Sequence, residues 1–295
     1  MANTYSLPQP PLIPPVASEK SVVYHGDAYE TLSRLPSDYF QTAVTSPPYW
    51  GLRDYGAEGQ VGSEEKLDDY IANLVQVFSE LKRVLKDDGT LWLNLGDSYT
   101  SGGRKRRAPD KKNPARAMSY RSPTPQGLKP KDLIGVPWRV AFALQQDGWY
   151  LRSEIIWHKT NPHPESVKDR PTRAHETIFL LTKSEKYYYD YRAIMEPAHN
   201  GDLRNKRSVW TVTSEPLKDA HFATFPTKLI RPCILAGSRP GDFVLDPFFG
   251  SGTTGLVAAL NDRYFVGIEL QSAYIQIARV RLARYGISFR EERIA

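Results

Sequence analysis

The feature that most constrains the fold is a glycine-rich turn between an apolar run and a helical run. Residues 244–246 read as a buried strand, and residues 247–255 then spell PFFGSGTTG. Gly250 and Gly252 permit a close approach of the backbone to a ligand, and the helix that follows presents free N–H groups at its start. Together with Gly255 they satisfy the G-x-G-x-x-G pattern of nucleotide-binding α/β folds. The turn therefore predicts an α/β chain with a nucleoside site.

A further strand is predicted just beyond this helix, at residues 264–269, and it ends in Glu269. An acidic side chain at that position is suited to bind ribose hydroxyl groups. No lysine follows the glycines, so the turn lacks the pattern of a P-loop that grips phosphates. A nicotinamide-dependent oxidoreductase is one interpretation of this turn taken alone.

A second unusual motif lies about two hundred residues earlier in the chain. Residues 45–50 spell TSPPYW, directly after an apolar pair at 43–44 that looks like the end of a buried strand. The two prolines remove backbone donors and fix φ, so the turn is stiff and leaves carbonyl groups free. A planar heterocycle with an exocyclic amine suits such a site, because the amine can donate to Ser46 and to the Pro47 carbonyl while the ring stacks on Tyr49. By itself, the motif is equally consistent with a turn that only caps a strand.

Together the two motifs resemble those of the DNA amino-methyltransferases, which transfer a methyl group from S-adenosylmethionine to cytosine N4 or adenine N6. In that family the D-P-F-x-G-S-G-T-T sequence is the S-adenosylmethionine loop, and S-P-P-Y is the catalytic loop. The catalytic loop comes first here, as in the permuted subgroup called β, and the resemblance extends from about Tyr24 to Arg284. It implies a Rossmann-like methyltransferase fold and a target base that flips out of double-stranded DNA.

The other apolar runs fit an α/β fold of this kind, with a seven-stranded, mostly parallel sheet that has an antiparallel end. The predicted strands lie at residues 22–25, 43–45, 90–95, 153–157, 177–181, 244–246 and 264–269. The two at 153–157 and 177–181 are expected to form the antiparallel end. Apolar residues recur with a helical period in 67–85, and further helices are predicted at 28–35 and 137–146.

The resemblance assigns roles to particular residues. The catalytic residues are Ser46, Pro47, Pro48 and Tyr49. The cofactor-binding residues are Asp27, Thr45, Phe225, Pro226, Lys228, Asp246, Pro247, Phe248, Gly250, Ser251, Gly252, Thr253 and Glu269. Two of these residues have a purely structural role as the alternative to cofactor binding. Asp27 is also placed to cap the helix that follows it. Lys228 lies in the first turn of a helix that Pro226 opens, and it is also consistent with a plain capped helix.

The charge distribution points to a polyanion as the partner. The chain carries a net charge of +6, and the segment 101–131 holds ten basic residues against one acid, which gives +9 there and −3 for the rest. Such a loop favours a DNA contact, with a solvated loop as the alternative. The segment 157–164 resembles a W-x-K-x-N-P-x-P element of the family, with a proline-rich loop that carries surface cations as the alternative. The segment 191–222 occupies the place of the family's target-recognition region. The residues expected to bind DNA are Trp50, Arg53, Arg104, Lys105, Arg106, Arg107, Lys159, Asn161, Arg204 and Arg207.

Composition limits the remaining interpretations. A single cysteine, Cys233, excludes an internal disulfide and a cysteine-based zinc site and fits a reducing cytoplasm, and no metal site is expected. Residues 1–20 hold five prolines and no apolar core of a signal peptide, so we expect a flexible arm there. A methyltransferase domain is expected at 21–295, with a basic insertion at 100–132. No run approaches the roughly 18 apolar residues of a membrane span.

Cytosine N4 is favoured as the acceptor, because adenine-N6 members of the family mostly carry Asp or Asn where this chain has Ser46. Adenine N6 remains the alternative. An oxidoreductase would leave the TSPPYW motif and the basic segment unexplained, and a non-catalytic DNA-binding module would leave the glycine-rich turn unexplained. A homodimer and a cognate restriction endonuclease stay open.

Overall fold

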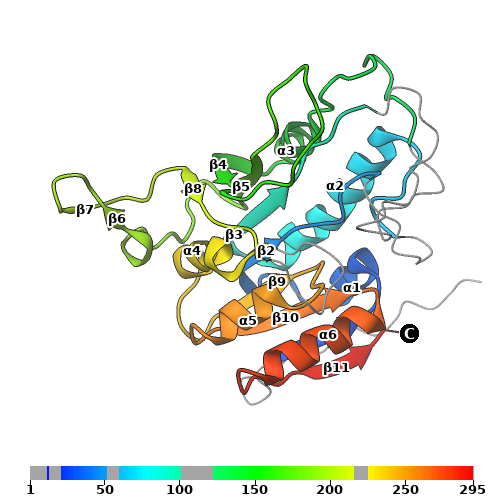
Figure 1. Cartoon of the computed structure of the whole chain (residues 1–295). Helices are drawn as coiled ribbons and strands as arrows, with labels where there is room; N and C mark the ends of the chain where they lie inside the picture. Colours follow the sequence, from blue (N-terminus) through cyan, green and yellow to red (C-terminus); the bar gives the residue numbers. More distant parts are fainter. Residues whose placement is uncertain (1–11, 13–20, 52–59, 101–121, 216–224, 295) are drawn as a thin grey trace, which may run out of the picture.

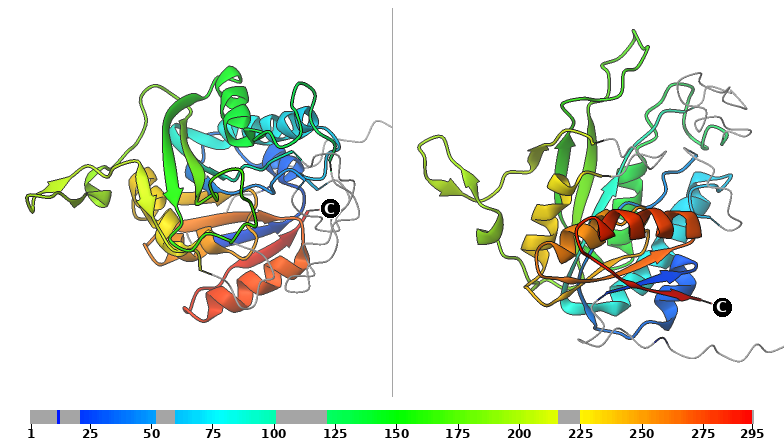
Figure 2. Two further views of the ribbon diagram at one scale, coloured as in Figure 1. Left: turned by 45° about the horizontal axis from the view of Figure 1, so that its top comes forward. Right: turned by 60° about the horizontal axis from the view of Figure 1, so that its bottom comes forward.

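The computed structural model describes residues 12, 21–51, 60–100, 122–215 and 225–294. They form three layers, in which helices cover both faces of a central β-sheet (Figure 1, Figure 2). The helices are α1 (Ala28–Arg34), α2 (Leu67–Val84), α3 (Val136–Gln146), α4 (Thr227–Gly237), α5 (Thr253–Ala259) and α6 (Ser272–Ala283). The strands are β1 (Ser21–His25), β2 (Phe40–Thr45), β3 (Leu85–Leu95), β4 (Tyr150–His158), β5 (His175–Thr182), β6 (Glu196–Pro197), β7 (Leu203–Arg204), β8 (Val209–Thr211), β9 (Phe243–Asp246), β10 (Tyr264–Glu269) and β11 (Arg290–Arg293).

Within the described residues the main sheet has nine strands, in the order β11-β1-β10-β9-β2-β3-β5-β4-β8. The pairs from β11 to β3 are parallel, and β5 runs antiparallel to both β3 and β4. Each of the seven predicted strands is present, so the mostly parallel sheet and its antiparallel end are confirmed.

The predicted number of seven strands is wrong, because one strand is added at each edge. β11 comprises Arg290–Arg293, four charged residues, and it pairs with β1. β8 has three residues and pairs with β4. Edge strands need little apolar surface, and polar or charged side chains are common on them. Neither segment therefore carries the apolar run by which a buried strand is recognised.

Successive residues of the inner strands point to opposite faces and fill two separate cores. On β1, Val22 and Tyr24 belong to the core under α1, α2 and α3, whereas Val23 belongs to the core under α4, α5 and α6. All three side chains are fully buried. A sheet covered on both faces requires nearly continuous apolar strands, which is why such strands are recognisable in the sequence.

The helix α2 covers one face of the sheet with an apolar stripe. Its buried residues are Leu67, Tyr70, Leu74, Val77, Phe78, Leu81 and Val84. It ends one residue earlier than predicted, and β3 begins at once at Leu85, with an irregular pairing to β2 before Thr90. Its exposed face is mostly polar. No helix in the described part of the chain is long and apolar enough to cross a membrane.

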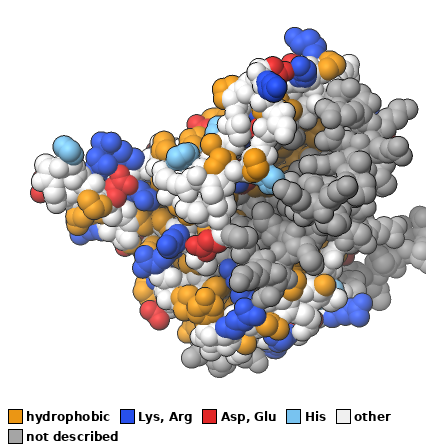
Figure 3. All heavy atoms as spheres, in the orientation of Figure 1, with side chains coloured by type: hydrophobic (Ala, Val, Ile, Leu, Met, Phe, Trp, Pro, Cys, Tyr) orange, Lys and Arg blue, Asp and Glu red, His pale blue; other side chains and the backbone are white. Residues whose placement is uncertain are grey.

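The described part of the predicted target-recognition region, residues 191–215, holds little regular structure. It contains a short 3-10 helix at Arg192–Ile194, the β6–β7 hairpin and β8. The hairpin projects from the body of the protein (Figure 1, Figure 2), and Figure 3 shows basic side chains on this projection. Across the hairpin, Arg204 pairs with Glu196 at 3.0 Å.

Phe249 fastens the glycine-rich turn to the sheet. Its ring stacks on that of Phe265, with the two centroids 5.6 Å apart. Gly267 in β10 makes room for the ring, since a Cβ built there would lie 2.4 Å from two ring carbons of Phe249. The position of the turn therefore depends on a glycine in the neighbouring strand.

A methyl group on Gly267 should destabilise the fold through Phe249. We expect Gly267→Ala to lower the free energy of unfolding by at least about 1–3 kcal/mol, the usual cost of overpacking a core. In a Phe249→Leu background the same change should cost less, because the obstructing ring is gone. Urea unfolding of the wild type, both single variants and the double variant measures this coupling. Equal costs in the two backgrounds would show that Phe249 does not restrict this position.

Candidate active site

Two loops that are far apart in the sequence meet at the carboxyl edge of the sheet. β2 and β9 are parallel neighbours, with Ala43 paired to Leu245, so the TSPPYW loop and the glycine-rich turn leave the sheet side by side. The Thr45 hydroxyl donates to Asp246 Oδ1 at 2.6 Å, across 201 residues of sequence. The fold thus joins the two motifs that the sequence analysis singled out.

Asp246 is buried, and the protein itself satisfies its carboxylate. Oδ2 accepts from the Thr254 hydroxyl at 2.6 Å, and Oδ1 accepts from the Phe248 backbone N–H at 3.1 Å as well as from Thr45. Burial raises the pKa of Asp246 to about 6, against the opposing effect of these hydrogen bonds. The sequence predicts a cofactor contact here, whereas these hydrogen bonds fasten Thr45 and the turn to each other.

The glycine-rich turn is closed by Glu269 at the end of β10. The Glu269 carboxylate accepts from the backbone N–H groups of Gly250 at 2.8 Å and Gln271 at 2.9 Å, and burial raises its pKa to about 7. Gly250 and Gly252 have φ of +51° and +78°, which favours glycine at both. A Cβ on Gly252 would lie 3.0 Å from that of Ala278, whereas one on Gly250 would have no neighbour closer than 3.9 Å. Gly252 therefore lets α6 pack on the turn, and Gly250 is the more open position.

Arg281 on α6 holds the far side of the same turn. Its Nη1 donates to the Ser251 carbonyl at 3.2 Å, to Ser251 Oγ at 3.1 Å and to Thr253 Oγ1 at 2.7 Å. The hydroxyls of Ser251 and Thr253, both predicted to bind the cofactor, are thus engaged by the protein. The sequence does not predict this role of Arg281, because one arginine in a helix carries no spacing signal.

Asp27 follows β1, the strand beside β10. Its carboxylate accepts from the Glu30 backbone N–H at 3.0 Å, so the predicted helix cap is confirmed. The neighbouring Gly26 N–H donates to the Glu269 carbonyl at 3.0 Å. Asp27, Glu269 and Asp246 therefore stand at the ends of three adjacent strands, β1, β10 and β9. A direct contact of Asp27 with the cofactor stays a prediction.

The predicted helix opened by Pro226 is confirmed, with Pro226 as the N-cap residue of α4. Pro226 is buried, Phe225 is half-buried against the core, and Lys228 is exposed in the first turn. On the glycine-rich turn, Pro247 is buried and the ring of Phe248 packs on α2. Their contacts with the cofactor stay predictions.

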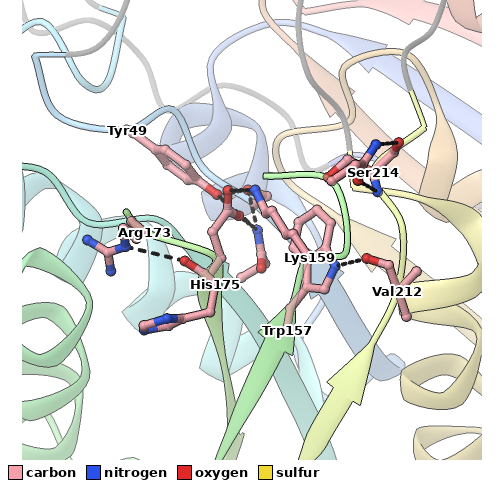
Figure 4. A network of polar contacts seen from close by, with 11 residues as sticks. Tyr49, Trp157, Lys159, Arg173, His175, Val212 and Ser214 are labelled. Atoms are coloured by element: carbon pink, nitrogen blue, oxygen red, sulfur yellow. Dashed lines mark hydrogen bonds and ion pairs between the residues drawn. The ribbon is translucent and has the colours of Figure 1, made fainter. Parts of the chain in front are cut away.

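The TSPPYW loop presents Ser46 and Tyr49 to a polar cluster at the ends of β3 and β5 (Figure 4). The Tyr49 hydroxyl donates to Glu176 Oε2 at 2.8 Å and lies 3.4 Å from Ser46 Oγ. Asn94 Nδ2 lies 2.9 Å from the Tyr49 oxygen, 3.0 Å from Glu176 Oε2 and 3.4 Å from Ser46 Oγ. The Tyr49 ring rests on the backbone of Gly96, where a Cβ would be 2.5 Å from Cε2.

Glu176 is the acidic member of this cluster, and its Oε1 pairs with Lys159. Burial opposes its ionisation, but Lys159 and the hydrogen bonds from Asn94 and Tyr49 outweigh burial and lower the pKa of Glu176. Burial and the nearby Glu176 raise the pKa of Tyr49 well above its usual value. Lys159 was predicted to bind DNA, and the structure engages it with Glu176 and with the Trp157 ring, 4.2 Å from its centroid. No motif or spacing in the sequence indicates a role for Glu176.

Two further residues predicted to bind DNA are turned toward the protein. The expectation for Trp50 is wrong, because its indole is 6 % exposed, packs in the core and donates to the Glu64 carbonyl at 2.9 Å. The Asn161 amide makes two hydrogen bonds with the backbone of Ser214, at 3.0 and 2.8 Å (Figure 4). Asn161 thus ties the segment after β4 to the segment after β8.

The remaining predicted residues divide into two groups. Arg204 pairs with Glu196, and Arg207 is exposed. Arg53, Arg104, Lys105, Arg106 and Arg107 lie outside the described residues, as does the arm at 1–20 apart from Leu12. Among the residues that the structure describes, no group of three or more His, Cys, Asp or Glu side chains is placed to hold a metal ion.

The chain is similar in sequence to known DNA methylases. The family model N6_N4_Mtase, described as DNA methylase, matches residues 40–280. The type II methyltransferase M.Cfr9I of Citrobacter freundii is 62% identical over 268 residues, which cover 91% of this chain and 89% of that protein.

Two solved structures share the fold. TTHA0409 from Thermus thermophilus, complexed with S-adenosyl-L-methionine, is 25% identical with a TM-score of 0.62, and the match covers 93% of this chain and 100% of that one. The PvuII DNA methyltransferase, described as cytosine-N4-specific, is 20% identical with a TM-score of 0.68 over 92% of this chain and 91% of that one, a likeness of fold alone. The family match leaves no support for the oxidoreductase or the non-catalytic module. The chain belongs to the N6_N4 DNA methylase family, and it is an S-adenosylmethionine-dependent DNA methyltransferase.

Proposed function

We propose that this chain methylates the N4 amine of a cytosine in double-stranded DNA, with adenine N6 as the alternative acceptor. The observation that carries the proposal is the junction of β2 and β9, where the hydrogen bond from Thr45 to Asp246 holds Ser46 beside the glycine-rich turn. A methyl donor and an amine acceptor must be held together in one geometry, and the junction supplies a loop for each.

The residues at this edge of the sheet fit S-adenosylmethionine. Glu269 offers carboxylate oxygens to ribose hydroxyls, and Gly250 lets a ligand approach the backbone. When bound, the cofactor supplies an activated methyl group. The residues that we propose to hold it are Asp27, Thr45, Phe225, Pro226, Lys228, Asp246, Pro247, Phe248, Gly250, Ser251, Gly252, Thr253 and Glu269. For Asp246, Ser251 and Thr253, whose side chains bond within the protein, the proposed role is to shape the turn.

Ser46 and the Pro47 carbonyl are the proposed acceptors for the two N–H groups of the target amine. Such an amine is a poor nucleophile because its lone pair is delocalised into the ring. Accepting both N–H groups favours a pyramidal nitrogen with a free lone pair, which is catalysis by positioning and electrostatics. Pro48 anchors the loop, since its carbonyl accepts from the Tyr70 hydroxyl at 2.9 Å. Tyr49 offers a ring for stacking, which offsets part of the few kcal/mol that base flipping costs.

Ser46 also supports cytosine over adenine as the target. Adenine-N6 members of the family mostly carry Asp or Asn at this position, and a serine hydroxyl has a shorter reach than either side chain. Both bases present two N–H donors on a ring edge, so the donor pattern alone does not separate them. Digestion of methylated DNA to nucleosides decides the base. N4-methylcytosine is the expected product, and N6-methyladenine as the sole product would contradict the assignment.

Replacing Ser46 should affect turnover far more than cofactor binding. We expect Ser46→Ala to lower kcat by about 100-fold or more, because its contacts with the amine matter chiefly in the transition state. The affinity for S-adenosylmethionine should stay within about twofold of the wild type. Ser33→Ala, an exposed hydroxyl on α1, is the matched control and should retain full activity. An equal loss of affinity and turnover would place Ser46 in cofactor binding instead.

We propose DNA contacts for the basic segment 101–131 and for Arg204 and Arg207 on the projecting region, because basic side chains neutralise phosphates. M.Cfr9I is named a type II methyltransferase, which supports a cognate restriction endonuclease for this chain. DNA as the substrate is consistent with a location in the cytoplasm.

Cofactor affinity should rise with pH through the titration of Glu269. Burial raises the pKa of this carboxyl to about 7, so it is mostly protonated below that pH and ionised above it. The ionised form of Glu269 is the better acceptor for ribose hydroxyls. If the bound ligand lowers the pKa of Glu269 by one unit, the ligand binds the ionised form about tenfold more tightly than the protonated form. Calorimetric titrations between about pH 6 and 8 should therefore show a smaller pH dependence for Glu269→Gln than for the wild type. Ionisation of the ligand itself affects both proteins equally. Identical slopes of log affinity against pH for the two proteins would therefore contradict the binding of ribose by Glu269.

A further inference from the structure

Glu176 ends a chain of hydrogen bonds that begins at Ser46. An ionised carboxylate accepts hydrogen bonds and donates none. The Tyr49 hydroxyl therefore gives its single hydrogen to Glu176 Oε2, at 2.8 Å. The Tyr49 oxygen is left as an acceptor for its other neighbours.

Asn94 favours the same donor-to-acceptor direction, from Ser46 through Tyr49 to Glu176. Its amide nitrogen has two hydrogens, and its two shortest contacts are to the Tyr49 oxygen at 2.9 Å and to Glu176 Oε2 at 3.0 Å. Its contact with Ser46 Oγ is longer, at 3.4 Å. The Ser46 hydrogen then points to the Tyr49 oxygen, also 3.4 Å away. Hydrogen bonds of catalytic groups are often long without substrate and tighten in the complex.

Lys159 keeps Glu176, the last residue of this series of hydrogen bonds, ionised. It pairs with Glu176 Oε1, which leaves Oε2 for Tyr49 and Asn94. The side chains of Lys159 and Glu176 are only 20% and 17% exposed, so the pair is weakly screened by water. Oriented in this way, Ser46 uses its hydrogen within the protein and keeps its lone pairs for an incoming amine.

We propose that Glu176 is a positioning residue that sets the direction of this chain, so that Ser46 accepts from the target amine, and that it takes up the proton that the methylated amine releases. This role rests on the proposed function of Ser46. In the proton step, an N–H bond of the cationic methylated amine breaks as an O–H bond forms at Ser46. Ser46 passes its own hydrogen to Tyr49, and Tyr49 passes its hydrogen to Glu176 Oε2. The amine ends neutral, Glu176 ends as the neutral acid, and both hydroxyls are restored.

Glu176→Gln tests the direction of the chain with a minimal change of shape. A glutamine directs its carbonyl oxygen toward Lys159, because an ammonium group can only donate. Its NH2 group then faces Tyr49 as a donor, which turns the hydrogens of Tyr49 and Ser46 toward the amine. We expect single-turnover methyl transfer at saturating DNA and cofactor to fall by about 100-fold. The dissociation constants for DNA and S-adenosylmethionine and the melting temperature should stay near those of the wild type.

Lys159→Met tests the charge on Glu176. In the described part of the chain, the charged or titratable side chains that contact Glu176 are Lys159 after β4 and Tyr49 after β2, and Asn94 on β3 is neutral. Without Lys159, only the hydrogen bonds from Asn94 and Tyr49 oppose the effect of burial, so the pKa of Glu176 rises. Glu176 then becomes protonated as the pH falls. The single-turnover rate of the variant should decrease at low pH, over a range where that of the wild type is flat, and recover at high pH.

A Glu176→Gln rate within about threefold of the wild type would overturn the proposal, as would a flat pH profile for Lys159→Met at the wild-type rate. If Glu176→Gln does not fold, Tyr49→Phe takes its place, because it removes the hydroxyl that links Ser46 to Glu176. Tyr49→Phe should then bind DNA and cofactor normally and lose about 100-fold in rate, and an unchanged rate would overturn the proposal. Failure of the proposed function is distinguishable, because the wild-type protein would then methylate no base amine at all.

Discussion

The candidate active site depends on the hydrogen bonds of one buried carboxylate, that of Asp246. It stands at the end of β9, and its hydrogen bonds join Thr45 of the TSPPYW loop, Thr254 of α5 and the backbone of Phe248. Leaving a buried polar group unsatisfied costs about 1–3 kcal/mol, so each donor helps to keep this charge inside the protein. A methyl transfer needs its two loops aligned to within a fraction of an ångström, and this carboxylate is the connection that can align them.

The acids around the site fall into two classes. Burial raises the pKa of Asp246 to about 6 and of Glu269 to about 7, and their hydrogen-bond partners in the described part of the chain are neutral. Glu176 has a lowered pKa, because Lys159 neutralises it. Glu176 already has its counter-ion in Lys159.

The sequence predicts the sheet better than it predicts the site. The seven inner strands are recognisable because two covered faces demand apolar runs, whereas the edge strands β8 and β11 carry no such signal. The meeting of the TSPPYW loop with the glycine-rich turn followed from the parallel order of strands. The contacts of Glu176 and Arg281 could not be predicted, because they arise from the pairing of β5 with β3 and the packing of α6 on the turn. Trp50 was misassigned because an aromatic residue beside a catalytic motif serves equally well as core.

A crystal structure with S-adenosylmethionine bound tests the central claim most directly. We predict that the cofactor lies on the Gly250–Thr253 turn, with its methyl group directed toward Ser46 and its ribose on Glu269. The hydrogen bonds of Asp246 to Thr45 and Thr254 should be unchanged. A cofactor bound away from this edge of the sheet, or an Asp246 that releases Thr45 to bind it, would contradict the account.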